Sequence, residues 1–141
     1  MKKILCILTF CFGLFAQDTT QTMLVDSIVK VYDGDTFYGN LSNLPGVFGT
    51  NIGIRLYGID TPELTGVDSC NTALAKQARS YLDKRLKSAC RIILRNIGRD
   101  KYFRLDAIVY ADGININAEM ISKGFAKPYT GEGPKPKFTC K

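Results

Sequence analysis

The sequence predicts an α+β fold: a five-stranded Greek-key β-barrel of OB type, with one amphipathic helix after the third strand and a short helix after the fifth. Two observations predict this fold. Five short segments rich in valine, isoleucine and aromatic residues, separated by turn residues, are typical of strands. Two further segments, one after the third strand and one after the fifth, have helical features.

The predicted strands are bounded by residues typical of turns and loops. Asp33-Gly34 follows the first strand and favours a tight hairpin turn, and residues 42–51 are rich enough in glycine, proline and asparagine to join a wider hairpin. In the third strand, Ile54 and Arg55 point to opposite faces because side chains alternate. We expect strands at residues 23–32, 35–41, 52–59, 91–96 and 104–110.

Two segments predict helices. In residues 72–87, apolar residues recur at three- and four-residue steps with basic residues elsewhere, which indicates an amphipathic helix. In residues 117–123, Asn117 is placed to cap the first amides and Gly124 to end the helix. Asp112-Gly113 predicts a turn before this second helix.

The N-terminal segment is typical of a secretory signal peptide. Lys2 and Lys3 precede an apolar run that ends at Ala16. The run is shorter than the roughly 20 residues of a membrane span, so we expect no stable membrane anchor and a secreted or periplasmic protein. We divide the chain into a signal peptide (1–16), a polar leader (17–22), one OB-type domain (23–129) and an irregular tail (130–141).

The chain is basic. It has 19 lysines and arginines against 13 acidic residues, a formal net charge of +6, and loss of Lys2 and Lys3 with the signal peptide leaves +4. A net positive charge favours a polyanionic partner without identifying one. We expect a monomer.

The cysteines suggest at most one disulfide. Cleavage removes Cys6 and Cys11 and leaves Cys70, Cys90 and Cys140 in an oxidising compartment. The predicted helix separates Cys70 from Cys90 by roughly 25 Å, too far for a disulfide. Any bridge therefore includes Cys140, and we expect Cys70 as its partner. The alternative is three free thiols, with Cys90 a small core residue.

The absence of histidine limits the possible chemistry. With no histidine in the chain, every hydrolase mechanism that uses imidazole as base, acid or metal ligand is excluded. A serine triad lacks its base, and the cysteines lack the paired spacing of a zinc site. Near neutral pH, proton transfer therefore falls chiefly to carboxylates.

Two acidic motifs are candidates for a site. Residues 33–36 read Asp-Gly-Asp-Thr, and residues 55–63 read Arg-Leu-Tyr-Gly-Ile-Asp-Thr-Pro-Glu. Each alone has a structural explanation, the first as a hairpin turn and the second as the start of a helical turn. Arg55 is harder to explain, because a guanidinium in an apolar strand needs anionic partners. An ion pair with Asp60 or Glu63 is its structural alternative.

Together with Lys101-Tyr102-Phe103-Arg104, these motifs resemble the thermonuclease (staphylococcal nuclease-like) family in order and spacing. The resemblance continues through residues 110–113 and 124–127 and covers roughly residues 25–129. It implies a calcium-dependent endonuclease that hydrolyses the phosphodiester bonds of DNA and RNA and leaves 3′-phosphate ends.

The resemblance assigns metal ligands and a base. It implies that carboxylate oxygens of Asp35 and Asp60 and the backbone carbonyl of Thr61 hold Ca²⁺, an ion that prefers hard oxygen ligands. It implies that Glu63 aligns or deprotonates the water that attacks phosphorus in line. The cation neutralises the phosphate, which would otherwise repel this water.

The resemblance also assigns residues that contact the substrate. Arg55 and Arg104 would donate hydrogen bonds to phosphate oxygens as charge builds in the transition state, where a planar guanidinium fits better than an ammonium. Lys101, Tyr102 and Tyr129 match positions that contact nucleotide in the family.

The sequence departs from the family pattern at three places. Phe103 stands where the family usually has glycine, so its side chain would press on substrate or re-aim Arg104. Asp106 stands in a strand position that is usually apolar, where it would pair with a base or face solvent. The tail lacks a long helix after Tyr129, and a Cys140 disulfide would substitute for that packing.

Two other functions remain open. A non-catalytic OB-type module would bind single strands through a basic groove and aromatic residues such as Tyr57, Tyr102 and Tyr129, and would need no metal carboxylates. A secreted structural protein with calcium as a staple would explain the carboxylates, but not the two arginines near them. The sequence indicates neither the biological role nor a base preference.

Overall fold

The structure is a computed structural model that describes residues 21–65 and 68–139. The predicted signal peptide and Cys140 lie outside the described residues. The elements follow in this order: β1 (Met23–Val25), β2 (Ser27–Val31), β3 (Thr36–Asn40), α1 (Gly46–Gly49), β4 (Ile52–Leu56), β5 (Ile59–Asp60), α2 (Ser69–Ser88), β6 (Ile92–Arg99), β7 (Leu105–Ala111), β8 (Ile114–Asn115), α3 (Ile116–Ser122) and β9 (Lys127–Pro128).

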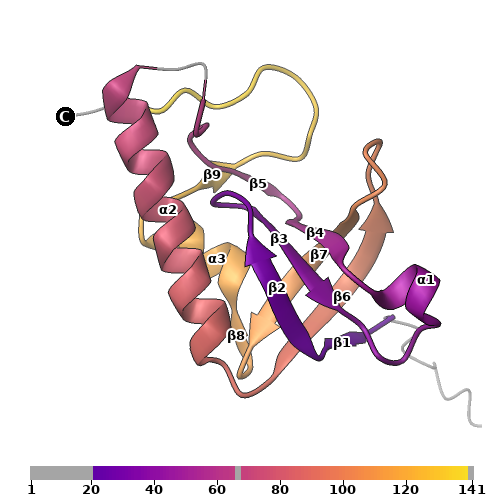
Figure 1. The fold of residues 1–141 in the computed structure, drawn as a ribbon. Helices are drawn as coiled ribbons and strands as arrows, with labels where there is room; N and C mark the ends of the chain where they lie inside the picture. Colours follow the sequence, from indigo (N-terminus) through magenta and orange to yellow (C-terminus); the bar gives the residue numbers. More distant parts are fainter. Residues whose placement is uncertain (1–20, 66–67, 140–141) are drawn as a thin grey trace, which may run out of the picture.

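The main sheet is mixed and curled (Figure 1). Its strand order is β1-β6-β7-β4-β3-β2, and β8 pairs with β7. β4 and β7 are parallel, whereas the other pairs of this sheet are antiparallel. The two strands at opposite ends of this order, β1 and β2, are separated in the chain only by Asp26, so the sheet curls back toward its own beginning.

The predicted fold class was right, but the predicted number of strands was too low. The α+β class is confirmed, but the described residues contain nine strand segments where five were expected. The single strand expected at residues 23–32 is two strands, because the chain changes partner at Asp26, from β6 to β3. The loop expected at residues 42–51 contains the short helix α1, which the sequence analysis missed.

The long helix α2 covers one side of the curled sheet (Figure 1). It confirms the predicted helix and begins three residues earlier, because Asp68 accepts a hydrogen bond from the Asn71 amide at 2.8 Å and caps it. Its apolar face packs into the core with side chains of the sheet. The largest of the fully buried core side chains are Phe37, Leu41, Ile54, Leu56, Ile59, Leu82, Leu86, Leu94, Ile116, Met120 and Val109.

The cap of the second predicted helix was assigned to the wrong asparagine. Asn115 caps α3, whereas Asn117 is buried inside the fold. The Asn117 side chain accepts a hydrogen bond from the Val109 amide at 2.9 Å and donates to the carbonyls of Tyr57 at 2.8 Å and Ala107 at 3.1 Å. A buried amide must satisfy its polar atoms, so Asn117 joins α3 to the sheet instead of capping the helix.

The two-stranded sheet β5–β9 places the tail. Asp60 pairs with Lys127 and Ile59 with Pro128, and the Tyr129 amide donates to the Gly58 carbonyl at 2.9 Å. The chain therefore leaves the fold beside Asp60, and the described tail residues beyond it form neither helix nor strand.

The cysteines correct one expectation. Cys90 is an exposed free thiol, so its placement in the core was wrong. Cys70 lies in the first turn of α2 and is disulfide-bonded. The predicted partner, Cys140, lies outside the described residues, so the pairing stays a prediction. Within the described residues, no helix is both long and apolar enough to cross a membrane.

Candidate active site

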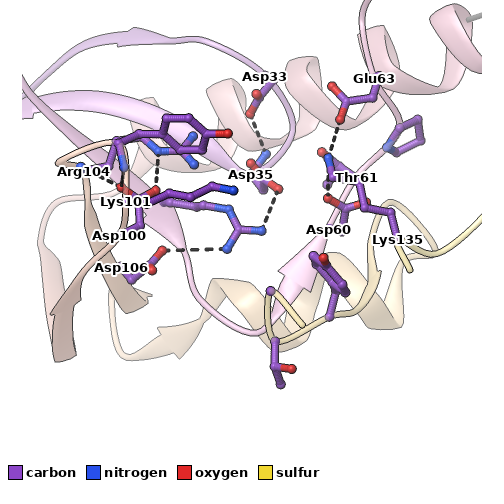
Figure 2. Close-up of a pocket in the computed structure, with 16 residues that line it drawn as sticks. Asp33, Asp35, Asp60, Thr61, Glu63, Asp100, Lys101, Arg104, Asp106 and Lys135 are labelled. Carbon is purple, nitrogen blue, oxygen red and sulfur yellow. Dashed lines mark hydrogen bonds and ion pairs between the residues drawn. The ribbon is translucent and has the colours of Figure 1, made fainter. Parts of the chain in front are cut away.

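One pocket of about 430 Å³ brings together every residue that the sequence analysis assigned to metal, phosphate or nucleotide (Figure 2). The pocket is also lined by three further carboxylates, by Pro62 and by tail residues. These are Asp33, Asp100, Asp106, Pro62, Thr130, Gly131 and Lys135. The assigned residues in its wall are Asp35, Arg55, Asp60, Thr61, Glu63, Lys101, Tyr102, Arg104 and Tyr129.

Strand pairing explains why residues far apart in sequence meet here. Thr36 lies opposite Arg55 where β3 pairs with β4, and Arg55 lies beside Asp106 where β4 pairs with β7. The Leu56 amide donates to the Asp35 carbonyl at 2.8 Å, which continues this alignment into the turn between β2 and β3. The pocket thus forms at one end of three neighbouring strands.

Arg55 lies between two carboxylates. Its Nη2 is 3.8 Å from Asp35 Oδ2 and its Nη1 is 3.7 Å from Asp106 Oδ1, and the side chain is 13% exposed. Nη2 also donates to the Ile59 carbonyl at 3.0 Å. The alternative pairing of Arg55 with Asp60 or Glu63 is not found among the described residues, and of the two alternatives for Asp106 the structure has the ion pair with a base.

The long distances to Arg55 leave donors in the pocket. Both ion pairs exceed hydrogen-bonding distance, and Asp106 Oδ1 is buried without a hydrogen-bond partner among the described residues. A guanidinium has five N–H groups, and Arg55 uses one for Ile59 within the described chain. An anion in the pocket would therefore find free donors on Arg55.

Arg104 is held by Asp100 and Thr36. Its Nε donates to Asp100 Oδ2 at 2.8 Å, and its Nη1 donates to the Thr36 hydroxyl at 3.0 Å. The Thr36 hydroxyl in turn donates to Asp35 Oδ1 at 2.8 Å. Burial alone would raise the pKa of Asp100. The hydrogen bonds from Arg104 outweigh burial and hold this pKa below its usual range, so Asp100 stays charged.

Asp35 and Asp60 are buried carboxylates that lack sufficient positive charge nearby. They are 7% and 4% exposed. Burial raises the pKa of Asp35 to about 7, with a contribution from Asp33, while Arg55 opposes the rise. Burial also raises the pKa of Asp60, where Lys135 opposes the rise and the charge of Asp35 adds to it. A cation between them would relieve both desolvation and repulsion.

A hard divalent cation fits this donor set. Among residues 21–65 and 68–139, no group of three or more acidic, cysteine or histidine side chains is arranged to hold a metal. A metal at Asp35 and Asp60 would therefore need further oxygen ligands from backbone and water, which is the coordination that Ca²⁺ accepts. The buried Thr61 follows Asp60 in the chain and also lines the pocket.

Lys135 is the residue that sequence reasoning missed. Its ammonium lies 2.5 Å from Glu63 Oε1 and 3.4 Å from Asp60 Oδ1, although both Lys135 and Glu63 are more than half exposed. The hydrogen bond with Glu63 raises the pKa of Lys135. Figure 2 shows Asp60, Glu63 and Lys135 on one side of the pocket and Arg104 on the other, with Asp35 between. No sequence motif marks Lys135, which follows Pro134 in an irregular tail.

Comparison with known proteins identifies relatives. A family model described as staphylococcal nuclease homologue matches residues 53–139. An uncharacterized protein of Methanocaldococcus jannaschii is 31% identical over 125 residues, covering 72% of this chain and 58% of that protein. An uncharacterized protein of Bacillus anthracis is 31% identical over 100 residues, covering 70% and 44%. An uncharacterized endonuclease of Haemophilus influenzae is 33% identical over 106 residues, covering 72% and 51%. The chain thus spans about half the length of these relatives.

Proposed function

The chain belongs to the family of staphylococcal nuclease homologues, and from this premise we propose that it is a calcium-dependent endonuclease that hydrolyses the phosphodiester bonds of DNA and RNA. One observation carries the proposal: a single pocket holds two buried carboxylates, Asp35 and Asp60, together with two arginines, Arg55 and Arg104. A phosphodiester is anionic and gains charge in its transition state, so its hydrolysis requires cationic groups that are already in position.

Calcium is the metal that the proposal assigns to Asp35, Asp60 and the carbonyl of Thr61. The two carboxylates are buried, and their pKa values are raised because the charges nearby do not offset the cost of burial. When bound, Ca²⁺ would neutralise the phosphate and help to orient the attacking water.

Glu63 is the proposed base. Its carboxylate lies in the pocket wall, where Lys135 holds it. In the reaction, the water oxygen bonds to phosphorus while the bond from phosphorus to the leaving oxygen breaks, and the water proton passes toward Glu63. A glutamine at this position would keep the size of the side chain and lose the ability to accept that proton.

Arg55 and Arg104 are the proposed phosphate ligands. Asp35 and Asp106 flank Arg55, and Asp100 fixes the Nε of Arg104, so both guanidinium groups are oriented before a substrate arrives. Oriented donors need no rearrangement as charge develops on the phosphate, and they therefore stabilise the transition state more than the ground state.

The remaining pocket residues suggest how the nucleotide is held. Lys101, Tyr102 and Tyr129 line the pocket beside the arginines, so contact with a phosphate, a base or a sugar is proposed for them. The predicted signal peptide supports a further proposal, that the protein acts outside the cytoplasm.

A second candidate function is binding of single strands without cleavage. The exposed Tyr102 ring, with Lys101 at 5.2 Å and Arg104 at 5.4 Å from its centroid, favours it. Buried carboxylates cost stability, and a protein that only binds nucleic acid would not need them at positions 35 and 60. The nuclease proposal explains both features.

The test measures cleavage of plasmid DNA and of single-stranded RNA by the secreted form. We expect cutting with calcium and none with excess chelator. Glu63→Gln should lower the rate by about 100-fold or more, the usual size of a general-base contribution, and Glu132→Gln, an exposed tail glutamate outside the pocket, should have no effect. Cutting that ignores calcium, or full activity in Glu63→Gln, would remove the mechanism.

A further inference from the structure

The loop between β6 and β7 presents two exposed aromatic rings next to the pocket. Phe103 is 79% exposed and Tyr102 is 68% exposed, which makes Phe103 the most exposed aromatic residue among those described. Tyr102 lines the pocket and Phe103 does not. In Figure 1 this loop projects from the ends of β6 and β7, away from the core. The Phe103 ring therefore has no role in core packing.

Although the loop is exposed, hydrogen bonds to Asp100 hold its backbone. The Asp100 side chain accepts from the backbone amides of Tyr102 and Arg104, both at 2.9 Å, and the Asp100 carbonyl accepts from the Phe103 amide at 3.1 Å. These bonds fix the backbone on both sides of Phe103. Phe103 itself has a φ of +68°, a left-handed conformation that glycine adopts freely and that a phenylalanine adopts only with strain.

Arg99 holds the ring from one side. Its guanidinium lies 4.9 Å from the centroid of the Phe103 ring, and its Nη1 donates to the Phe103 carbonyl at 2.9 Å. One residue thus fixes both the ring and the backbone that carries it. The ring remains largely exposed, so a planar group can stack on it with a positive charge behind it.

The surroundings continue the same chemistry. Lys101 lies near the Tyr102 ring, and Arg95 lies 5.0 Å from the centroid of Tyr110, on the same two strands. A further cation–aromatic pair therefore lies on the same two strands, away from the loop. Proteins that bind single-stranded nucleic acid combine basic groups along the backbone with aromatic faces for the bases.

We infer that Phe103, supported by Arg99, is a stacking subsite for an unpaired nucleobase of the strand whose phosphate occupies the pocket. The inference rests on the proposed function and adds a binding subsite to it, which a strand reaches only if it is long enough to extend beyond the pocket. A base inside a duplex is already stacked on both of its faces, so duplex interiors and products too short to reach Phe103 do not use this subsite.

Binding of oligonucleotides tests the subsite. The probe is a fluorescein-labelled octathymidylate, measured by anisotropy with calcium in a Glu63→Gln background so that it is bound and not cut. Phe103→Gly should raise its dissociation constant about fivefold, the lower range for one stacked base, while the dissociation constant for a dithymidylate stays unchanged. Phe103→Tyr should bind like the parent.

Two controls separate stacking from other effects. An abasic octamer has the same phosphates without bases, so Phe103→Gly should not change its affinity. Phe48→Ala removes an exposed phenylalanine that does not line the pocket and should leave all affinities unchanged. Thermal unfolding of Phe103→Gly should show equal or higher stability, because glycine relieves the positive φ.

The outcomes also separate this inference from the proposed function. If Phe103→Gly binds the octamer like the parent, or loses equal affinity for the abasic octamer, the subsite is wrong even where the wild-type protein still cuts DNA. If the wild-type protein neither cuts nor binds nucleic acid, the proposed function fails and this inference fails with it.

Discussion

Replacing Lys135 with methionine tests whether the tail competes with calcium. The substitution keeps a long apolar stem and removes the ammonium that lies 2.5 Å from Glu63 Oε1 and 3.4 Å from Asp60 Oδ1. A cation that binds Asp60 has to displace or repel this ammonium. We therefore expect Lys135→Met to bind calcium more tightly than the wild-type protein.

The magnitude follows from the distance and the exposure. Two unit charges 3.4 Å apart, as in the Lys135–Asp60 pair, interact in water with about 1.2 kcal/mol. The Lys135 side chain is 57% exposed, and exposed ion pairs usually contribute about 0.2–1 kcal/mol. About 1 kcal/mol is therefore an upper value, and it corresponds to a roughly fivefold lower dissociation constant for calcium.

The measurement is calorimetric titration of calcium at constant ionic strength, without nucleic acid. Lys135→Arg keeps the charge and should bind calcium like the wild type. Lys137→Met removes another lysine of the same tail, whose ammonium makes no ion pair within the described residues, and should have no effect. Unchanged or weaker binding in Lys135→Met, or an equal gain in Lys137→Met, would refute the reasoning.

Three further predictions concern single residues. Arg104→Lys should lower kcat by about 100-fold or more with little change in KM, because its oriented donors matter most in the transition state; equal losses in steady-state kinetics would contradict this. Arg85 donates to Glu119 at 2.8 Å, and the Tyr81 hydroxyl also donates to it; the hydrogen bond from Arg85 lowers the pKa of Glu119. The ionised Glu119 therefore stabilises the fold above its unfolded pKa of about 4.3, and this stabilisation is lost as pH falls through the lower folded pKa. Glu119→Gln should reduce the free energy of urea unfolding by about 1–2 kcal/mol at pH 7 and by much less near pH 3, and a loss independent of pH would count against it. Burial raises the pKa of Asp35 to about 7, so its ionisation destabilises the calcium-free fold increasingly from the unfolded pKa of about 3.9 up to the folded value. Asp35→Asn should unfold at a higher temperature than the wild type at pH 8 without calcium and should no longer bind calcium; a lower melting temperature would overturn this assignment.

Local patterns predicted the elements that carry most of the pocket. Asp33-Gly34 and the alternation around Arg55 depend on neighbouring residues only, so the hairpin and the strand could be read directly. The helical period of the apolar residues likewise placed α2 within three residues of its observed start, although the capping residue Asp68 was not recognised. These segments bring their functional side chains to strand ends, and the sheet then assembles the site.

Long-range contacts could not be predicted in this way. Asparagine often caps helices, which is why Asn117 was predicted to be the cap. Its amide instead bonds backbone groups of Val109, Ala107 and Tyr57, and no local pattern encodes these contacts. Lys135 reaches Glu63 only because β9 pairs with β5 and turns the tail back over the pocket. The division at Asp26 depends on which strands become neighbours, and this is set by the closing of the sheet.

The pairing of β5 with β9 has a consequence for how the proposed site can vary. After Pro128 the described tail adds no strand or helix to the fold, yet one of its lysines touches two of the pocket carboxylates. The described residues that follow can therefore vary in charge at little risk to folding, and in length as far as the predicted disulfide with Cys140 can still form. If the site binds calcium as proposed, its affinity for the ion could be changed through the tail without changing the main sheet.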